Sequence, residues 1–246
     1  MYKKGIFTIV SNELIGRDVY RMVLAGDTSD LQVPGRFVNI ELDGFFLRRP
    51  ISVNDVNDKE LTIVYKAVGE GTRAMSKYLP GKELDILTGL GNGFAIKEDS
   101  VKPVLVGGGV GVPPMYLLCK RLLEKGVKPQ VVLGFGSEKD VILADEFRAL
   151  GVDVHITTND GSVGMKGFVT DAMKTLDYDY FYACGPEPML KALCMQTSTS
   201  GLLSFEERMG CGFGACMGCS CKTKYGTKRI CKDGPILDRD EVIWEA

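Results

Sequence analysis

Residues 104–114 read VLVGGGVGVPP, a short apolar run that passes directly into glycines and then into two prolines. The stretch from Met115 to Glu124 has a helical pattern, and proline is tolerated in the first turn of a helix because its missing N–H has no partner there anyway. Free N–H groups and the positive end of a helix dipole make such a turn suitable for a pyrophosphate. The candidate contacts are Gly107, Gly108, Gly109, Gly111 and Pro113. Because proline replaces the last glycine of the G-x-G-x-x-G fingerprint, a merely tight turn is the alternative interpretation.

The alternation of apolar strand and helix continues through residues 99–200, which predicts a doubly wound parallel sheet flanked by helices. Further strands are expected at 131–133, 154–156 and 180–183, and helices at 143–150, 169–176 and 188–195. Ligands of such sheets bind at the carboxyl ends of the strands, so Cys184, Gly185 and Pro186 should border the same crevice as the glycine turn. Cys184 either contacts a nicotinamide there or is a small buried thiol without a chemical role.

Glu138 follows the second strand of this region, where an acidic residue favours an unphosphorylated ribose and an arginine favours a 2′-phosphate. NAD is therefore expected rather than NADP.

Residues 1–98 alternate apolar and polar side chains with a period of two, and Pro-Gly turns stand between the runs. Strands are expected at 5–10, 19–25, 37–42, 61–68 and 84–87, which predicts an antiparallel barrel. Residues 47–53, LRRPISV, place two arginines before a strand-like run, and their simplest interpretation is a solvated pair. Residues 69–72, GEGT, open a helix predicted over 73–78 and form a second candidate anion site.

Residues 201–246 have too little apolar material for a core, so something other than packing is expected to hold them. Four cysteines follow the plant-type 2Fe-2S spacing C-x4-C-x2-C-x11-C, namely Cys211, Cys216, Cys219 and Cys231. Small residues between them allow backbone N–H groups to approach the sulfurs. A structural zinc site is the alternative, but zinc ribbons usually present two separate C-x2-C pairs. Cys221 is interpreted as a free neighbour.

Composition excludes several classes of function. A formal net charge of −2 gives no electrostatic reason to expect nucleic acid or an anionic membrane as partner, and no apolar run is long enough for a membrane span. Five of the eight cysteines lie between residues 211 and 231, which favours a metal site in a reducing cytoplasm over disulfides. A Rieske centre needs two histidines, and the chain has one, His155, outside every motif.

These motifs together resemble the ferredoxin reductase family. Arg49-x-x-Ser52 resembles its flavin-binding signature, residues 107–113 its nicotinamide turn, and residues 184–186 its C-G-P element. With the GEGT turn and the four cysteines on one chain, the resemblance narrows to the electron-transfer subunits of NAD-dependent dihydroorotate dehydrogenases B. Some relatives carry aspartate at the first ligand position, where this chain has Cys211.

The resemblance implies three parts: an FAD-binding barrel over 1–98, an NAD-binding α/β domain over 99–200 and a 2Fe-2S module over 201–246. It implies FAD contacts from Arg49, Pro50, Ile51, Ser52, Val64, Tyr65, Lys66, Gly71 and Thr72. It also implies an NADH-dependent oxidoreductase subunit that passes electrons to an FMN-containing catalytic subunit, as a heterotetramer with two copies of each chain. Such a subunit does not oxidise dihydroorotate by itself.

Two other functions fit the motifs. One is the flavin and iron–sulfur subunit of another complex, such as a ferredoxin:NADP reductase, a sulfide dehydrogenase or an anaerobic sulfite reductase. The other is a redox sensor without onward electron transfer, although the sequence offers no separate output domain.

Overall fold

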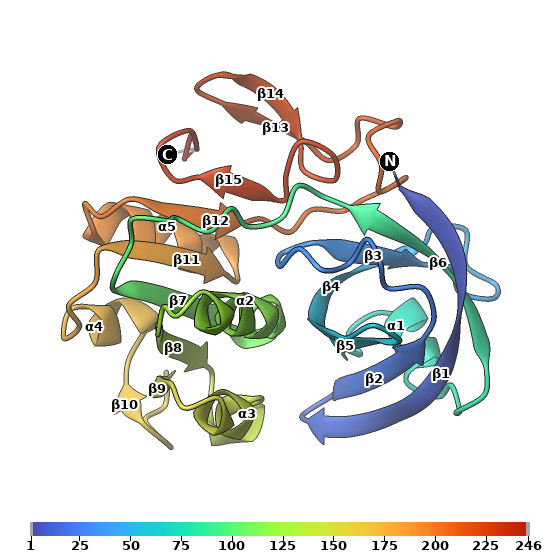
Figure 1. Ribbon diagram of the computed structural model, residues 1–246, viewed down its shortest axis with the longest axis horizontal. Coiled ribbons are helices and arrows are strands. Elements are labelled where there is room, and N and C mark those ends of the chain that lie inside the picture. The colour runs from blue at the N-terminus through green and yellow to red at the C-terminus, as the bar shows by residue number, and fades with distance from the viewer. Residues whose placement is uncertain (1, 245–246) are drawn as a thin grey trace.

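The computed structural model describes residues 2–244 and contains a barrel and a second, mainly parallel sheet, with the C-terminal segment across both (Figure 1). The barrel is closed and antiparallel, because β1 pairs with both β2 and β6. Its strands, in spatial order, are β1 (Lys3–Gly16), β2 (Val19–Ala25), β5 (Glu60–Lys66), β4 (Arg49–Val56), β3 (Phe37–Ile40) and β6 (Glu83–Leu90). Alternate apolar side chains such as Met22, Leu24 and Ile63 fill its interior, as a period of two requires.

One short helix, α1 (Glu70–Met75), follows β5 and begins three residues before the predicted start at Arg73. The difference arises at Gly69, whose N–H donates to Thr72 Oγ1 at 3.2 Å and closes the first turn early.

The second sheet has seven strands in the order β10 (Met165–Lys166), β9 (Asp153–Thr158), β8 (Gln130–Phe135), β7 (Pro103–Gly108), β11 (Tyr180–Cys184), β12 (Gly201–Ser204) and β15 (Ile236–Asp238). All neighbouring strands are parallel except β12 and β15. Two 3₁₀ turns lie in its loops, η1 (Gly109–Gly111) and η2 (Glu138–Asp140).

Helices cover both faces of this sheet, so its central strands are buried on both sides. One face packs against α2 (Pro113–Glu124) and α3 (Ala144–Ala149), the other against α4 (Val169–Met173) and α5 (Glu187–Gln196). The predicted fold class, a barrel beside a doubly wound sheet with an appended C-terminal part, is confirmed.

The C-terminal segment is held partly by packing, contrary to the expectation from its composition. Its strands β12 and β15 extend the parallel sheet, while β13 (Ser220–Thr223) and β14 (Gly226–Arg229) form a separate hairpin. Cys219, Ile230 and Cys231 pack against Phe37 and Leu90 of the barrel. The segment thus uses apolar surface that other regions supply, which its own composition does not reveal. The division at residues 98 and 200 remains a prediction.

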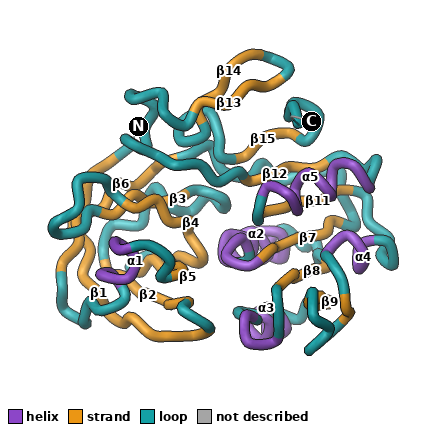
Figure 2. Tube along the Cα trace, turned by 180° about the vertical axis from the view of Figure 1, so that it is seen from behind, coloured by secondary structure: helices purple, strands orange, loops and turns teal. Residues whose placement is uncertain are grey.

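Helix α2 joins the two main bodies, and it lies between them in both views (Figures 1 and 2). Leu117 of α2 belongs to the barrel's apolar cluster, and Lys120 Nζ lies 2.7 Å from Asp55 Oδ1 of β4. The crevice between barrel and sheet therefore has walls fixed relative to each other. Among the helices of residues 2–244, none has the length and apolar character to cross a bilayer.

Candidate functional site

A pocket of about 340 Å³, here called the barrel pocket, opens beside β4 and β5. Eight of the nine residues expected to contact FAD line it: Arg49, Pro50, Ile51, Ser52, Val64, Tyr65, Lys66 and Thr72. They converge because β4 and β5 are antiparallel neighbours and the first turn of α1 follows β5 directly. The ninth, Gly71, lies under Arg49: a Cβ at Gly71 would stand 2.4 Å from Arg49 Nε.

The two adjacent arginines have different surroundings. Arg48 forms an ion pair with Asp85 at 2.9 Å and another with Glu41, so its charge is used within the barrel. Arg49 lies with its guanidinium carbon 5.0 Å from the centre of the Phe45 ring, donates to the Leu47 carbonyl and is among the residues that line the barrel pocket. Of the two arginines, Arg49 is therefore the one available to a ligand phosphate in this pocket.

The opposite wall of the barrel pocket comes from the C-terminal segment and was missed by sequence reasoning. The additional lining residues are Phe37, Val68, Val110, Ser204, Phe205, Glu206, Glu207, Met209 and Pro235. Most follow β12, which lies between β11 and β15 in the sheet, and this segment packs beside the barrel. Apart from Val110, which belongs to the glycine turn, no motif in the sequence marks them, because their position depends on the order of the strands.

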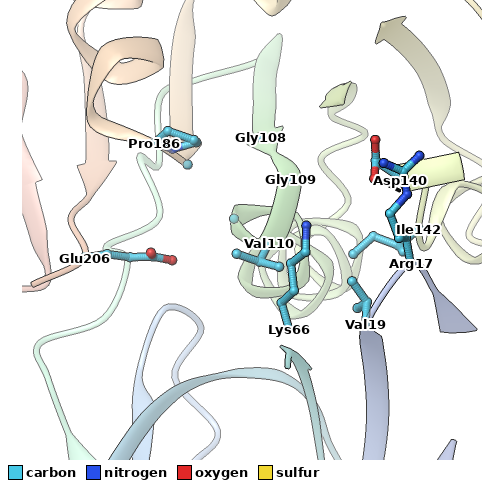
Figure 3. Close-up of a pocket in the computed structure, with 12 residues that line it drawn as sticks. Arg17, Val19, Lys66, Gly108, Gly109, Val110, Asp140, Ile142, Pro186 and Glu206 are labelled. Carbon is cyan, nitrogen blue, oxygen red and sulfur yellow. Dashed lines mark ion pairs between the residues drawn. The ribbon is translucent and has the colours of Figure 1, made fainter. Parts of the chain in front are cut away.

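A second pocket of about 320 Å³, the turn pocket, lies at the carboxyl ends of β7 and β11. Its lining includes Gly108, Gly109 and Gly111 from the glycine turn, with Gly185 and Pro186 from the C-G-P element. Figure 3 shows Glu206 and the Arg17–Asp140 ion pair on opposite sides of this pocket and Lys66 between them.

Three residues, Lys66, Val110 and Glu206, line both the barrel pocket and the turn pocket. The two pockets are therefore direct neighbours across a short stretch of side chains. Burial raises the pKa of the Glu206 carboxyl. Its position at this junction makes Glu206 a candidate functional residue that the sequence did not reveal.

A third pocket of about 560 Å³, the sheet pocket, continues from the turn pocket and shares Gly108, Gly109 and Pro186 with it. Its other walls come from the ends of β8 and β9 and from α4 and α5, at Gly134, Phe135, Gly136, Thr157, Asn159, Phe168, Val169, Thr170, Pro188, Met189, Ala192 and Gln196. The two pockets together form an elongated site over bare backbone, which fits a dinucleotide. No lysine or arginine lines the sheet pocket, whereas Arg17 and Lys66 line the turn pocket.

Four residues expected at the nucleotide site do not line the turn pocket or the sheet pocket. Gly107 packs under the turn, where a Cβ would meet Val112 Cα at 2.8 Å, and Pro113 is buried at the start of α2. Glu138 donates its backbone N–H to Ser162 Oγ at 2.7 Å, while Asp140, two residues further, reaches the turn pocket. Cys184 is 1% exposed, and burial raises the pKa of its thiol to about 12.

Gly111→Ala is expected to disrupt the glycine turn, because a Cβ at this position would lie 2.3 Å from the carbonyl oxygen of Cys184. A backbone atom cannot move aside as a flexible side chain can, so we expect a loss of about 1–3 kcal/mol in stability and weaker NADH binding. Chemical denaturation and titration with NADH would measure both. Gly126→Ala is the control, because it lies at φ +77° with nothing within 4 Å of its Cβ: it should cost stability through backbone strain and leave NADH binding unchanged, and comparable NADH affinity in the two variants would contradict the prediction.

The four cysteines of the C-x4-C-x2-C-x11-C pattern converge in two pairs. The N–H of Cys216 donates to Cys211 Sγ at 3.5 Å, and the N–H of Cys231 donates to Cys219 Sγ at 3.4 Å. Within residues 2–244 no three Cys, His, Asp or Glu side chains are grouped as a single metal ion would require. Two pairs of thiols instead match a group with two irons, each of which takes two protein ligands.

The surroundings of Cys211 favour a thiolate. Burial opposes its ionisation, but backbone N–H groups, among them that of Ala215 at 3.2 Å, more than compensate and lower the pKa of its thiol to about 6. Burial and the neighbouring Cys219 raise the pKa of the Cys231 thiol to about 12, and a bound metal would favour its thiolate. The donor set and its backbone N–H groups fit a 2Fe-2S cluster.

Two remaining residues from the sequence analysis lie apart from this arrangement. Cys221 is half-buried in β13, and burial raises the pKa of its thiol. His155 is in β9, paired with Val132 of β8, and is absent from the lining of the barrel, turn and sheet pockets.

Two family models and several curated proteins match this chain by sequence. Residues 206–243 match the iron–sulfur cluster binding domain of dihydroorotate dehydrogenase B, and residues 105–195 match the oxidoreductase NAD-binding domain. The electron transfer subunit of dihydroorotate dehydrogenase B (NAD(+)) from Shouchella clausii is 42% identical, over 98% of each chain. The subunit of the same name from Bacillus velezensis is 45% identical, over 98% of this chain and 99% of that protein.

Solved structures of other proteins have a similar fold. The NADH-dependent reduced ferredoxin-NADP oxidoreductase, described in connection with flavin-based electron bifurcation, is 32% identical with a TM-score of 0.88, over 97% of this chain and 90% of that one. The ferredoxin reductase in carbazole 1,9a-dioxygenase is 20% identical with a TM-score of 0.69, over 79% of this chain and 65% of that one. The second likeness shows the fold alone.

Proposed function

The chain belongs to the family of electron transfer subunits of NAD(+)-dependent dihydroorotate dehydrogenase B, and we propose that it carries electrons from NADH, through FAD and a 2Fe-2S cluster, to the FMN of a dihydroorotate dehydrogenase catalytic subunit. The observation that carries the proposal is the contiguity of the sites. Lys66, Val110 and Glu206 line both the turn pocket and the barrel pocket, and Phe37 lines the barrel pocket and packs against the cysteine segment.

The barrel pocket is the proposed FAD site. Arg49 would pair with the flavin phosphate, while Ser52 supplies a hydroxyl three residues along the same strand. When bound, FAD accepts a hydride from NADH and the cluster carries single electrons, which together convert a two-electron donor into one-electron steps.

The turn and sheet pockets are the proposed NADH site. Backbone N–H groups of residues 108–111 would face the pyrophosphate, with the N-terminus of α2 behind them. Because the sheet pocket offers no basic side chain to a 2′-phosphate, NADH is favoured over NADPH. Hydride transfer needs alignment more than a protein acid or base, so the chain's task here is to orient the two ligands and exclude water between them.

Cys211, Cys216, Cys219 and Cys231 are the proposed cluster ligands. Backbone N–H groups of Ala215 and Cys216 would stabilise the charge on Cys211, which is the chain's means of setting the potential. Cys216 is exposed, so one side of this loop is open to a partner protein.

The partner in this proposal is a separate catalytic subunit that holds FMN, in a cytoplasmic heterotetramer with two copies of each chain. The printed names of the relatives support a larger assembly, since each is called an electron transfer subunit. Alone, the chain is expected to reduce its flavin with NADH and to leave dihydroorotate unchanged.

The test begins with anaerobic purification of the full chain and assays of flavin, iron and acid-labile sulfide. We expect one FAD and one 2Fe-2S cluster per chain, with absorbance of both lost on addition of NADH and at least about tenfold slower bleaching with NADPH. Reconstitution with the catalytic subunit should then give orotate-dependent oxidation of NADH. Zinc in place of iron, or no flavin, would contradict the proposal.

A second candidate is supported by the 32% identical structure, whose description names an NADH-dependent ferredoxin-NADP oxidoreductase. In that case the loaded chain would pass electrons to NADP⁺ or ferredoxin through a different partner subunit. Comparison of orotate with these acceptors, in the complex purified from its own cells, separates the two functions.

A further inference from the structure

Strand β3 (Phe37–Ile40) lies between the barrel pocket and the cysteine segment and contacts both. Phe37 lines the barrel pocket and also packs with Cys219 and Ile230. Alternation along the strand places Asn39 on the same face as Phe37, and Asn39 is the register partner of Pro50, itself a lining residue of the barrel pocket. One strand face thus runs from the proposed flavin site to the proposed cluster loop.

Asn39 contacts the cluster loop directly. Its Nδ2 donates to the carbonyl oxygen of Cys211 at 3.2 Å, and the side chain is 1% exposed. The next residue, Gly212, has φ +81°, and a Cβ there would stand 2.4 Å from Asn39 Nδ2. The Asn39 amide therefore contacts the loop at Cys211, the first of the four cysteines.

Stability alone does not account for an amide at this position. Asn39 Oδ1 is buried, and no hydrogen-bond partner for it is found among the described residues. Burying an unpaired acceptor costs free energy that an apolar side chain of similar size would not cost. The amide is retained in spite of that cost, which points to a role for the hydrogen bond with Cys211.

The hydrogen bond fixes the peptide that joins Cys211 to Gly212, from which the loop turns back toward the sulfur. Further along this turn the N–H groups of Ala215 and Cys216 point at Cys211 Sγ, at 3.2 and 3.5 Å. Such N–H donors withdraw charge from a ligating sulfur and raise the potential of an iron–sulfur cluster. A loop that is free to shift would lose part of this effect.

We propose that Asn39 is a positioning residue that orients Cys211, the first cluster ligand, against the strand of the flavin pocket and thereby raises the reduction potential of the cluster. The inference rests on the proposed function, since it assumes that Cys211 ligates iron and that FAD occupies the barrel pocket.

The main variant is Asn39→Leu, which keeps the branched shape and the number of side-chain heavy atoms and removes both the donor and the unpaired acceptor. We expect unchanged or higher thermal stability and full flavin content. The cluster potential should fall, so that the equilibrium constant for its reduction drops about tenfold, equivalent to about 59 mV for a one-electron couple. The EPR signal of the reduced cluster should change as well. A purely structural residue would not move stability and potential in opposite directions.

Asn54→Leu is the matched control, because Asn54 is also buried in the barrel with an unpaired Oδ1. It should leave the potential and the EPR signal as in the wild type. Asn39→Ala serves as the second variant if Asn39→Leu fails to fold; loss of iron with retained flavin in either one also supports the proposal.

An unchanged potential and EPR signal in an Asn39 variant with a full cluster would overturn the inference. So would joint loss of flavin and iron in both variants while Asn54→Leu keeps both, because the effect would then be on the barrel as a whole. A wild-type chain without iron or flavin refutes the proposed function instead, which separates the two failures.

Discussion

Cys219→Ala is expected to remove the cluster and leave the flavin site intact. Cys219 is 2% exposed and lies in the apolar cluster with Ile230 and Leu237, so alanine removes the thiolate without a large cavity. A 2Fe-2S centre needs all four soft anionic ligands, and iron should fall from about two per chain to near zero. Iron and sulfide assays, flavin absorbance and stopped-flow reduction by NADH measure the outcome.

In this variant NADH should still bleach the flavin, because Cys219 does not line the barrel pocket or the turn pocket. Electron transfer to the partner's FMN should be lost. Cys221→Ser, two residues away in β13, is the matched control and should retain iron. Full iron in Cys219→Ala, or its loss in Cys221→Ser, would show that the ligand set has been assigned wrongly.

Arg49→Ala is expected to weaken FAD binding roughly 10–100-fold, since a charge-assisted hydrogen bond contributes about 1.5–3 kcal/mol. Two contacts position the Arg49 guanidinium: it packs over the Phe45 ring, and it occupies the space that a side chain at Gly71 would take. Flavin per chain after gel filtration, and titration of the apoprotein with FAD, give the direct measurement.

Arg48→Ala is the control for that variant, because it removes the same charge one residue earlier. Arg48 is bound to Asp85 and Glu41 within the barrel, so its loss should lower the melting temperature slightly and leave flavin content unchanged. Equal flavin loss in both variants would mean that Arg49 acts through the fold of β4 and not through contact with the ligand.

The motifs found in the sequence belong to short stretches whose conformation is decided locally. Residues 104–114 form a strand, a turn and a helix start because glycine and proline restrict the backbone there. The four cysteines need only a tight loop and one later residue to meet, so their spacing predicts the site. Glu138 shows the limit of this reasoning, because a loop can place a neighbour, here Asp140, at the pocket instead.

Residues that face a site from a distant segment could not be predicted in this way. Glu206 and Phe205 reach the barrel pocket because they follow β12, which lies between β11 and β15 in the sheet. Asn39 meets Cys211 across 172 positions of sequence. Such contacts depend on strand order and on how the barrel packs against α2. Neither of these can be predicted from the pattern of a short stretch of sequence.

By itself the sequence determined which chemistry the chain carries: a backbone turn for a pyrophosphate, a cationic strand end, and four thiols at iron–sulfur spacing. The tertiary structure alone decided how these parts are placed in contact, with Lys66, Val110 and Glu206 between two pockets and Asn39 on the cluster loop. The physical reason is that local backbone preferences act over a few residues, whereas the distance between cofactor sites is set by burial of apolar surface shared among segments far apart in the chain.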